Sequence, residues 1–129
     1  MLVIKEQQFK VFEQMLDKNL ESRIIAHLRS NHEVLVDRLP EDLLREMVRN
    51  GIMRARKYSL SWESSLTAFV ALMFEIAPNF DDHPDIQRVL KDKTVEPDQR
   101  IDLLSALVSE EDWQEAVKNY DESAWFPEN

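Results

Sequence analysis

The stretch SWESSLTAFVALMFEIAP, residues 61–78, decides the fold of this chain. Wound as a helix, it carries apolar side chains on almost every side. A helix of this kind is normally buried at the centre of a domain, and this one is too short and too interrupted to cross a membrane. Ser61 is a good N-cap for it, and Pro78 ends it. We therefore expect the other elements to pack around residues 66–76.

The composition favours helices in the rest of the chain as well. Its 129 residues include a single Gly and no Cys, while helix formers such as Leu, Glu, Lys and Ala are abundant. The length fits one domain. The lack of Cys excludes disulfides, thiolate zinc sites and cysteine nucleophiles, and a single Gly excludes nearly every glycine-rich phosphate loop. We predict an all-α, compact single-domain bundle of five or six helices around the central apolar helix.

A long first helix is predicted from about Lys5 to Arg29. Its apolar positions recur at steps of three and four and form one stripe, which must meet a partner: Phe9, Phe12, Leu16, Leu20, Ile24 and Leu28. Residues 30–32 break this run, and Val34–Val36 follow as an apolar connector.

A second helix is predicted to begin at Pro40, because proline and the acids after it suit a first helical turn. Its expected buried face is Leu43, Leu44, Met47, Val48, Ile52, Ala55 and Tyr58. Gly51 interrupts it at a cost of about 1 kcal/mol relative to alanine. We expect another helix to cross closely at Gly51, with a bend as the alternative.

Three shorter helices are predicted in the second half: from Pro84 to about Lys91, from Pro97, and from the capping box at Ser109–Asp112. Their expected core positions are Ile86, Val89 and Leu90, then Ile101, Leu104, Leu107 and Val108, then Trp113, Ala116, Val117 and Tyr120. The helical domain would cover residues 1–120. Residues 121–129 form an acidic aromatic tail, expected to fray unless its aromatic residues dock.

Motifs for catalysis or metal binding are weak. The link Asp81–Asp85 gathers possible ligands, yet acids at a helix start are what capping favours, so we expect no metal and no cofactor. Glu75 is the one acid among residues 66–76 of the central helix, and the clustered Ser59, Ser61, Ser64 and Ser65 lack a nucleophile motif. We predict that the chain is not an enzyme, with a small helical hydrolase as the enzymatic alternative.

Charge is distributed unevenly. The net charge is -9; residues 1–64 hold 11 basic and 10 acidic side chains, and residues 65–129 hold 5 and 15. This balance disfavours nucleic acid as a partner. The second helix carries a cluster of basic residues: Arg45, Arg49, Arg54, Arg56 and Lys57. We expect them to pair with the acidic half of the same chain, with an external acidic partner as the alternative.

The acidic half is the expected surface for a protein partner. Its candidate binding residues are Glu110, Glu111 and Asp112, which would steer a basic protein, with Trp125 and Phe126 as aromatic anchors. Arg45, Arg49 and Arg56 form a second candidate surface.

The order of residues along positions 1–107 follows a recognisable pattern: Arg23, His27-Leu28, Gly51-Ile52, Arg54-Ala55, Tyr58, Met73-Phe74, Pro78, Phe80-Asp81, Pro84, Leu90 and Asp92. It resembles a family of small helical proteins found in bacterial type VI secretion and polymorphic-toxin gene neighbourhoods. That family usually has glycine where this chain has Ser59 and Ala77.

The resemblance implies a soluble partner of a secreted toxin or its delivery machinery, and it implies no catalytic residues. Such a partner would be an accessory protein that holds an effector, or an immunity protein that blocks a toxin. Residues 1–6 lack the apolar core and cleavage site of a signal peptide, so a cytoplasmic bacterial protein is expected.

Overall fold

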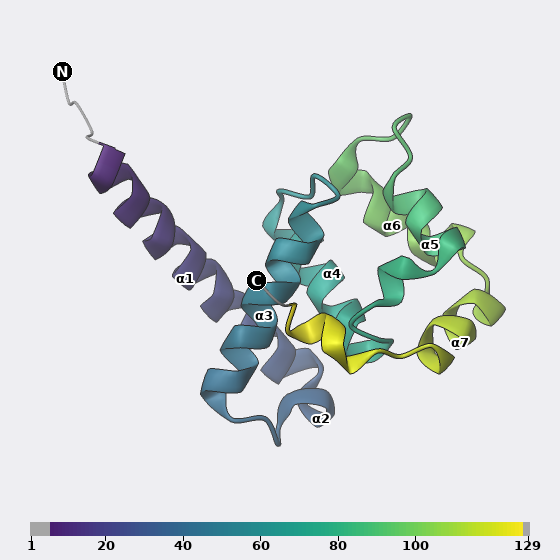
Figure 1. Cartoon of the computed structure of the whole chain (residues 1–129), viewed down its shortest axis with the longest axis horizontal. Coiled ribbons are helices and arrows are strands. Elements are labelled where there is room, and N and C mark those ends of the chain that lie inside the picture. The colour runs from purple at the N-terminus through teal and green to yellow at the C-terminus, as the bar shows by residue number, and fades with distance from the viewer. Residues whose placement is uncertain (1–5, 128–129) are drawn as a thin grey trace.

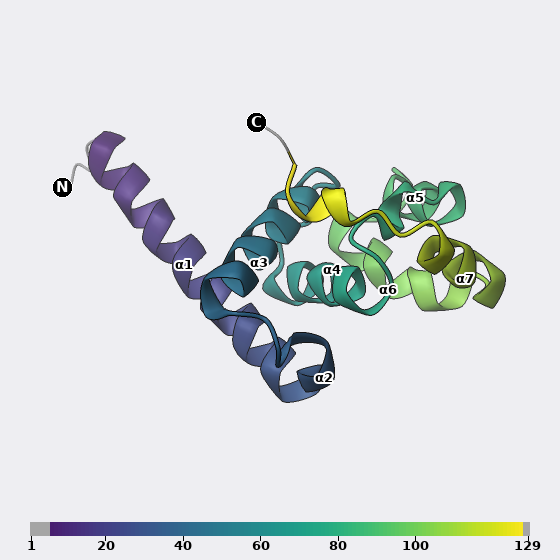
Figure 2. The same ribbon diagram turned by 60° about the horizontal axis from the view of Figure 1, so that its bottom comes forward.

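A computed structural model describes residues 6–127, with the side chains of residues 6, 7, 9 and 12 left aside, and all of its regular structure is helical. The helices are α1 (Glu6–Asn31), α2 (Glu33–Val36), α3 (Glu41–Arg56), α4 (Glu63–Glu75), α5 (Pro84–Leu90), α6 (Pro97–Leu107) and α7 (Glu110–Lys118), with 3-10 turns η1 (Phe80–Asp82) and η2 (Glu122–Trp125). The all-α prediction is confirmed, with seven α-helices in the described chain instead of five or six. Part of α1 projects from the body (Figures 1 and 2).

Helix α4 is central, as its apolar composition predicts. Leu66, Phe69, Val70 and Met73 are fully buried on it, and α4 packs against α3, α6 and α1. The Phe69 ring contacts those of Tyr58 and Phe80, with centroids 5.8 and 4.9 Å away. One helix thus ties both halves of the chain into a single core.

Gly51 lies where α3 crosses α4. A Cβ atom at this position would come within 3.0 Å of Val70 Cγ2 and 3.2 Å of Met73 Sδ, which is closer than side chains normally approach. The expectation of a close crossing is therefore confirmed, and the missing side chain of Gly51 brings the two helices together.

The start of α4 is capped by another helix, and the prediction for Ser61 is wrong. The N-cap residue is Trp62, and the cap comes from the carboxylate of Asp98 at the start of α6. Asp98 accepts the backbone N–H of Ser61 and of Trp62 at 2.9 and 2.8 Å, and the Ser61 hydroxyl at 3.0 Å. Burial pushes the pKa of Asp98 up, but these hydrogen bonds outweigh it and hold the pKa below its ordinary value.

Among the described side chains of the α1 stripe, those that are buried lie in its second half. Leu20, Ile24 and Leu28 are buried, whereas Leu16 is half exposed; the side chains of Phe9 and Phe12 lie outside the described residues. The first half of α1 extends away from the body in both views (Figures 1 and 2). The predicted connector after it forms the single turn of α2, where Val36 is buried and Val34 is exposed.

The three helices predicted in the second half of the chain begin where expected, at Pro84, at Pro97 and after the N-cap Ser109. The Ser109–Asp112 capping box is also confirmed. Three predicted core residues are instead exposed in the described part of the chain: Leu107 on α6, Val117 on α7 and Tyr120 just after α7.

The tail after α7 docks on the domain up to residue 127. Trp125 is only 3% exposed, its ring lies 4.5 Å from that of Phe74, and its backbone oxygen accepts a 2.8 Å hydrogen bond from Asn50 Nδ2. Of the two outcomes expected for this segment, fraying or docking through its aromatic residues, Trp125 shows docking, because its ring fills a place in the core.

Candidate functional site

The basic side chains of α3 bind carboxylates of the same chain. Arg45 and Arg49 both reach Glu21, at 3.5 and 3.2 Å, and Arg56 reaches Asp17 at 3.0 Å. The hydrogen bond and charge of Glu21 raise the pKa of the Arg49 guanidinium. Pairing within the chain is therefore confirmed. The carboxylates that pair with these three arginines lie on α1, with Glu41 of α3 as a second partner of Arg45, and not in the acidic second half as predicted.

Arg54 is the α3 arginine that reaches the acidic half. Its guanidinium binds Asp81 at 2.7 Å and Asp82 at 3.2 Å, and the Tyr58 hydroxyl donates a 2.6 Å hydrogen bond to Asp81. Burial, and then the bond to Asp81, raises the pKa of Tyr58. These contacts make Asp81 a structural anchor between α3 and η1.

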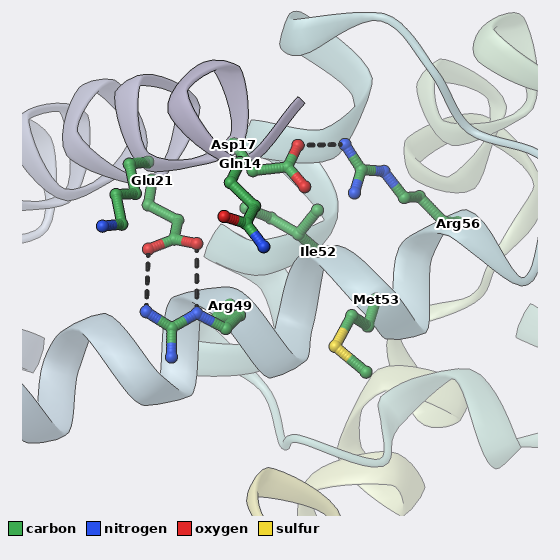
Figure 3. A pocket seen from close by; sticks show the side chains of 8 residues that line it. Gln14, Asp17, Glu21, Arg49, Ile52, Met53 and Arg56 are labelled. Carbon is green, nitrogen blue, oxygen red and sulfur yellow. Dashed lines mark hydrogen bonds and ion pairs between the residues drawn. The ribbon is translucent and has the colours of Figure 1, made fainter. Parts of the chain in front are cut away.

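A groove of about 270 Å³ runs between α1 and α3. Its lining, which we call the α1/α3 groove, is Gln14, Asp17, Lys18, Glu21, Arg49, Ile52, Met53 and Arg56. Figure 3 shows the Glu21–Arg49 and Asp17–Arg56 pairs on either side of Gln14 and Ile52. The groove therefore combines an apolar floor with charges that already satisfy one another.

Two exposed apolar residues of α1 lie beside the α1/α3 groove but outside its lining. Val11, Met15 and Lys18 follow one another at steps of four and three, so they share one face of the helix, and Lys18 lines the groove. Val11 and Met15 are 56% and 58% exposed, and Met53 across the groove is 52% exposed. This set of apolar side chains offers a surface on which a helix of another protein can pack.

The Asp81–Asp85 link is held differently from the predicted carboxylate caps. Asp81 and Asp82 bind Arg54, and the cap of α5 is His83, whose Nδ1 accepts the backbone N–H of Asp85 at 3.2 Å. The other ring nitrogen, Nε2, lies 2.8 Å from Glu115. The prediction that this link caps a helix is thus confirmed, but the capping group of α5 is the imidazole of His83 and not a carboxylate.

His83, Asp112 and Glu115 bring three possible metal-ligand atoms within 4.8 Å of one another. Because Nδ1 of His83 accepts a backbone N–H, the proton of the neutral ring lies on Nε2 and is donated to Glu115. A histidine that binds metal through Nε2 instead carries its proton on Nδ1, where it would oppose the N–H of Asp85. The capping geometry therefore favours a hydrogen-bonded link between α5 and α7.

The structure does not bring the predicted partner surface together. Glu110 and Glu111 are exposed in the first turn of α7, while Asp112 is engaged by Ser109. Trp125 lies in η2, which packs on α3 at a distance from the start of α7 (Figure 1). Its use as an exposed anchor is wrong because the ring is buried in the core. Phe126 beside it keeps 38% of its surface exposed.

Comparison of the chain with family models, characterised proteins and solved structures finds no match in any of the three. In the part of the chain from residue 6 to 127, no helix has the length and apolar character needed to cross a bilayer. The exposed apolar residues of α1 beside the groove were missed by the sequence reasoning, because Val11 and Met15 lie outside the stripe that defines the helix.

Proposed function

We propose that this chain is a non-catalytic protein-binding module, an accessory protein of the adaptor or chaperone type that binds a secreted effector or the delivery spike of type VI secretion. The observation that carries the binding role is the pair of exposed apolar side chains Val11 and Met15 on α1, which lie beside the α1/α3 groove. The residue pattern from Arg23 to Asp92 supports the secretion context.

The α1/α3 groove suits a helix of the effector or spike component. Val11, Met15 and Met53 are each about half exposed, so covering them contributes about 1 kcal/mol per side chain. Glu21 and Asp17 at the rim already have arginine partners, so docking leaves no new unpaired charge on them. An incoming helix thus gains apolar contact at low electrostatic cost.

An immunity protein that inhibits a cognate toxin is the second candidate. The exposed acids Glu110 and Glu111 and the net charge of -9 favour it, because an acidic surface suits the basic active site of a toxin that acts on an anionic substrate. In that case the contact surface is α7 and not α1.

Co-expression with a neighbouring toxin gene separates these functions. For the accessory role, we expect Met15→Glu to reduce the amount of co-purified effector at least about tenfold, because a charge replaces apolar contact. Secretion of the effector should fall in parallel, with growth of the producing cell unchanged. If this chain instead rescued growth of cells that express the toxin, and the double variant Glu110→Lys, Glu111→Lys did not, the result would establish immunity.

Leu107→Glu is the matched control, because Leu107 is an exposed apolar residue on α6 outside the α1/α3 groove. Circular dichroism of both variants checks that they fold. If folded Met15→Glu retains effector as the parent does, the α1 face is not the binding surface.

A further inference from the structure

A second groove lies on another face of α3, beneath the docked tail. We call it the tail groove; it is lined by Leu35, Leu39, Leu43, Met47, Met73, Phe74, Tyr120, Glu122, Trp125 and Phe126. Residues from four separate parts of the chain form it, and η2 closes one side where it packs on α3 (Figure 1). No residue is shared with the α1/α3 groove.

The lining of the tail groove is almost wholly apolar. Leu35, Tyr120 and Phe126 are exposed along it, while the thioethers of Met47 and Met73 lie deeper, and methionine adapts its shape to different partners. Its volume is about 280 Å³, roughly twice the ~150 Å³ of a cavity that takes up one benzene ring. Two apolar side chains spaced one helical turn apart therefore fit.

Acidic side chains outnumber basic ones at the edge of the tail groove, where the exposed Arg38 precedes the lining residue Leu39. Glu122 is the one charged residue of the lining, and Asp121 beside it is exposed. On α3, the exposed Asp42 and Glu46 each precede a lining residue by one position, so they flank the apolar row of Leu43 and Met47. An occupant with positive charge beside its apolar face complements this edge.

We propose that the tail groove is a second docking surface, which takes an amphipathic helix of a partner protein with Lys or Arg beside its apolar face. Apolar side chains of that helix enter between Leu43 and Phe126, and its basic residues meet Glu46 and Glu122. Recognition of this kind uses the i, i+3, i+4 and i+7 positions of the incoming helix.

Two separate grooves let the chain hold two partners at once. An adaptor that joins an effector to a delivery component needs two surfaces, whereas an inhibitor needs one. The tail groove therefore goes beyond the proposed function, and its existence does not depend on whether the α1/α3 groove binds an effector.

Model peptides test the charge and shape of the tail groove directly. Two labelled helical peptides of about 18 residues share one leucine face and carry either Lys or Glu on its flanks; a third scrambles the Lys peptide. By fluorescence anisotropy, we expect the Lys peptide to bind at least about tenfold more tightly than the other two. Its affinity should fall as salt rises.

Variants of the full chain assign that binding to the tail groove. Leu35→Glu changes an exposed lining residue and should weaken the binding of the Lys peptide at least about tenfold, whereas Leu107→Glu, on α6 outside both grooves, should leave it unchanged. Exchanging both Glu46 and Glu122 for Lys should reverse the preference toward the Glu peptide.

Equal binding of the Lys, Glu and scrambled peptides would overturn the proposal, as would full binding to folded Leu35→Glu. A second copy of the chain as occupant would appear in light scattering as a dimer that Leu35→Glu abolishes, and that result too would overturn it. Loss of effector binding in Met15→Glu alone concerns the α1/α3 groove and leaves this proposal standing.

Discussion

Arg54 on α3 and Asp81 in η1 lie 27 positions apart, and the guanidinium Nε contacts the carboxylate at 2.7 Å. Asp81 is buried, and the hydroxyl of Tyr58 donates to its second oxygen. Through these contacts α3 holds the segment that follows α4.

Removing the arginine of this pair should be costly. Arg54→Ala leaves the buried carboxylate of Asp81 without its cation, and we expect a loss of about 3 kcal/mol in the free energy of unfolding, measured by urea denaturation. Arg56→Ala is the control, since its pair with Asp17 is exposed on both sides and contributes at most about 1 kcal/mol. Equal effects of the two substitutions would contradict a structural role for Asp81.

Acid should weaken the cap of α4. The pKa of Asp98 in the folded chain lies below its ordinary value near 3.8, so the folded state takes up this proton less readily than the unfolded state. The stabilisation is complete above that ordinary value and is lost as the pH falls through the folded pKa.

Asp98→Asn tests this pH dependence. At pH 7 we expect the substitution to lower the free energy of unfolding by about 1–2 kcal/mol, because a charged cap is replaced by a neutral one. Below pH 4 the difference between parent and variant should shrink, as thermal melts across a pH series would show. A constant difference from pH 7 to pH 3 would rule out the ionised cap.

Ser59 is the one described residue other than glycine with a positive φ, at 66°. Glycine adopts this conformation without steric cost, whereas a residue with a Cβ atom does not. Ser59→Gly should therefore raise the free energy of unfolding by about 0.5–1 kcal/mol and increase Tm. Ser59→Ala keeps the Cβ atom and should give no increase; a matching increase in Ser59→Ala would show that strain at φ is not the cause.

The His83 link should hold without an added ion. Its Nδ1 caps α5, so treatment with a chelator should leave Tm unchanged, while His83→Ala should lower it by removing both the cap and the contact with Glu115. A fall of several degrees on chelation, reversed by one divalent cation, would instead assign the cluster of His83, Asp112 and Glu115 to a metal.

The features that could be predicted from sequence are those set by neighbours along the chain. The burial of α4, the Ser109 capping box and the close crossing at Gly51 follow from local spacing or from the lack of a side chain. The cap from Asp98 could not be predicted, because its donors Ser61 and Trp62 lie more than 30 positions away. For the same reason, the helix that pairs with Arg49 could not be chosen from charge balance alone.

The candidate site was the least predictable part, since exposure depends on how far the fold covers each helix. The α1 stripe was expected to meet a partner along its whole length, yet the body covers it only from Leu20 onward among the described side chains. In the tail, a residue expected to be exposed is buried instead. Aromatic residues among acids are typical of an interface, but Trp125 fills the core.

Trp125 and Phe126 are adjacent aromatic residues whose substitutions should have opposite consequences. Trp125→Ala removes a buried ring that packs on Phe74, so we expect a loss of about 3–5 kcal/mol in the free energy of unfolding. Phe126→Ala removes a ring at the edge of the tail groove and should change stability by less than about 1 kcal/mol. It should also increase the dissociation rate of the Lys peptide from the tail groove, because apolar anchors act mainly on dissociation.

Urea denaturation measures the loss of stability, and stopped-flow anisotropy separately measures the dissociation rate of the peptide. If Phe126→Ala destabilised the chain as strongly as Trp125→Ala, both rings would belong to the core, and the tail groove would lose the aromatic side chain that closes its outer edge.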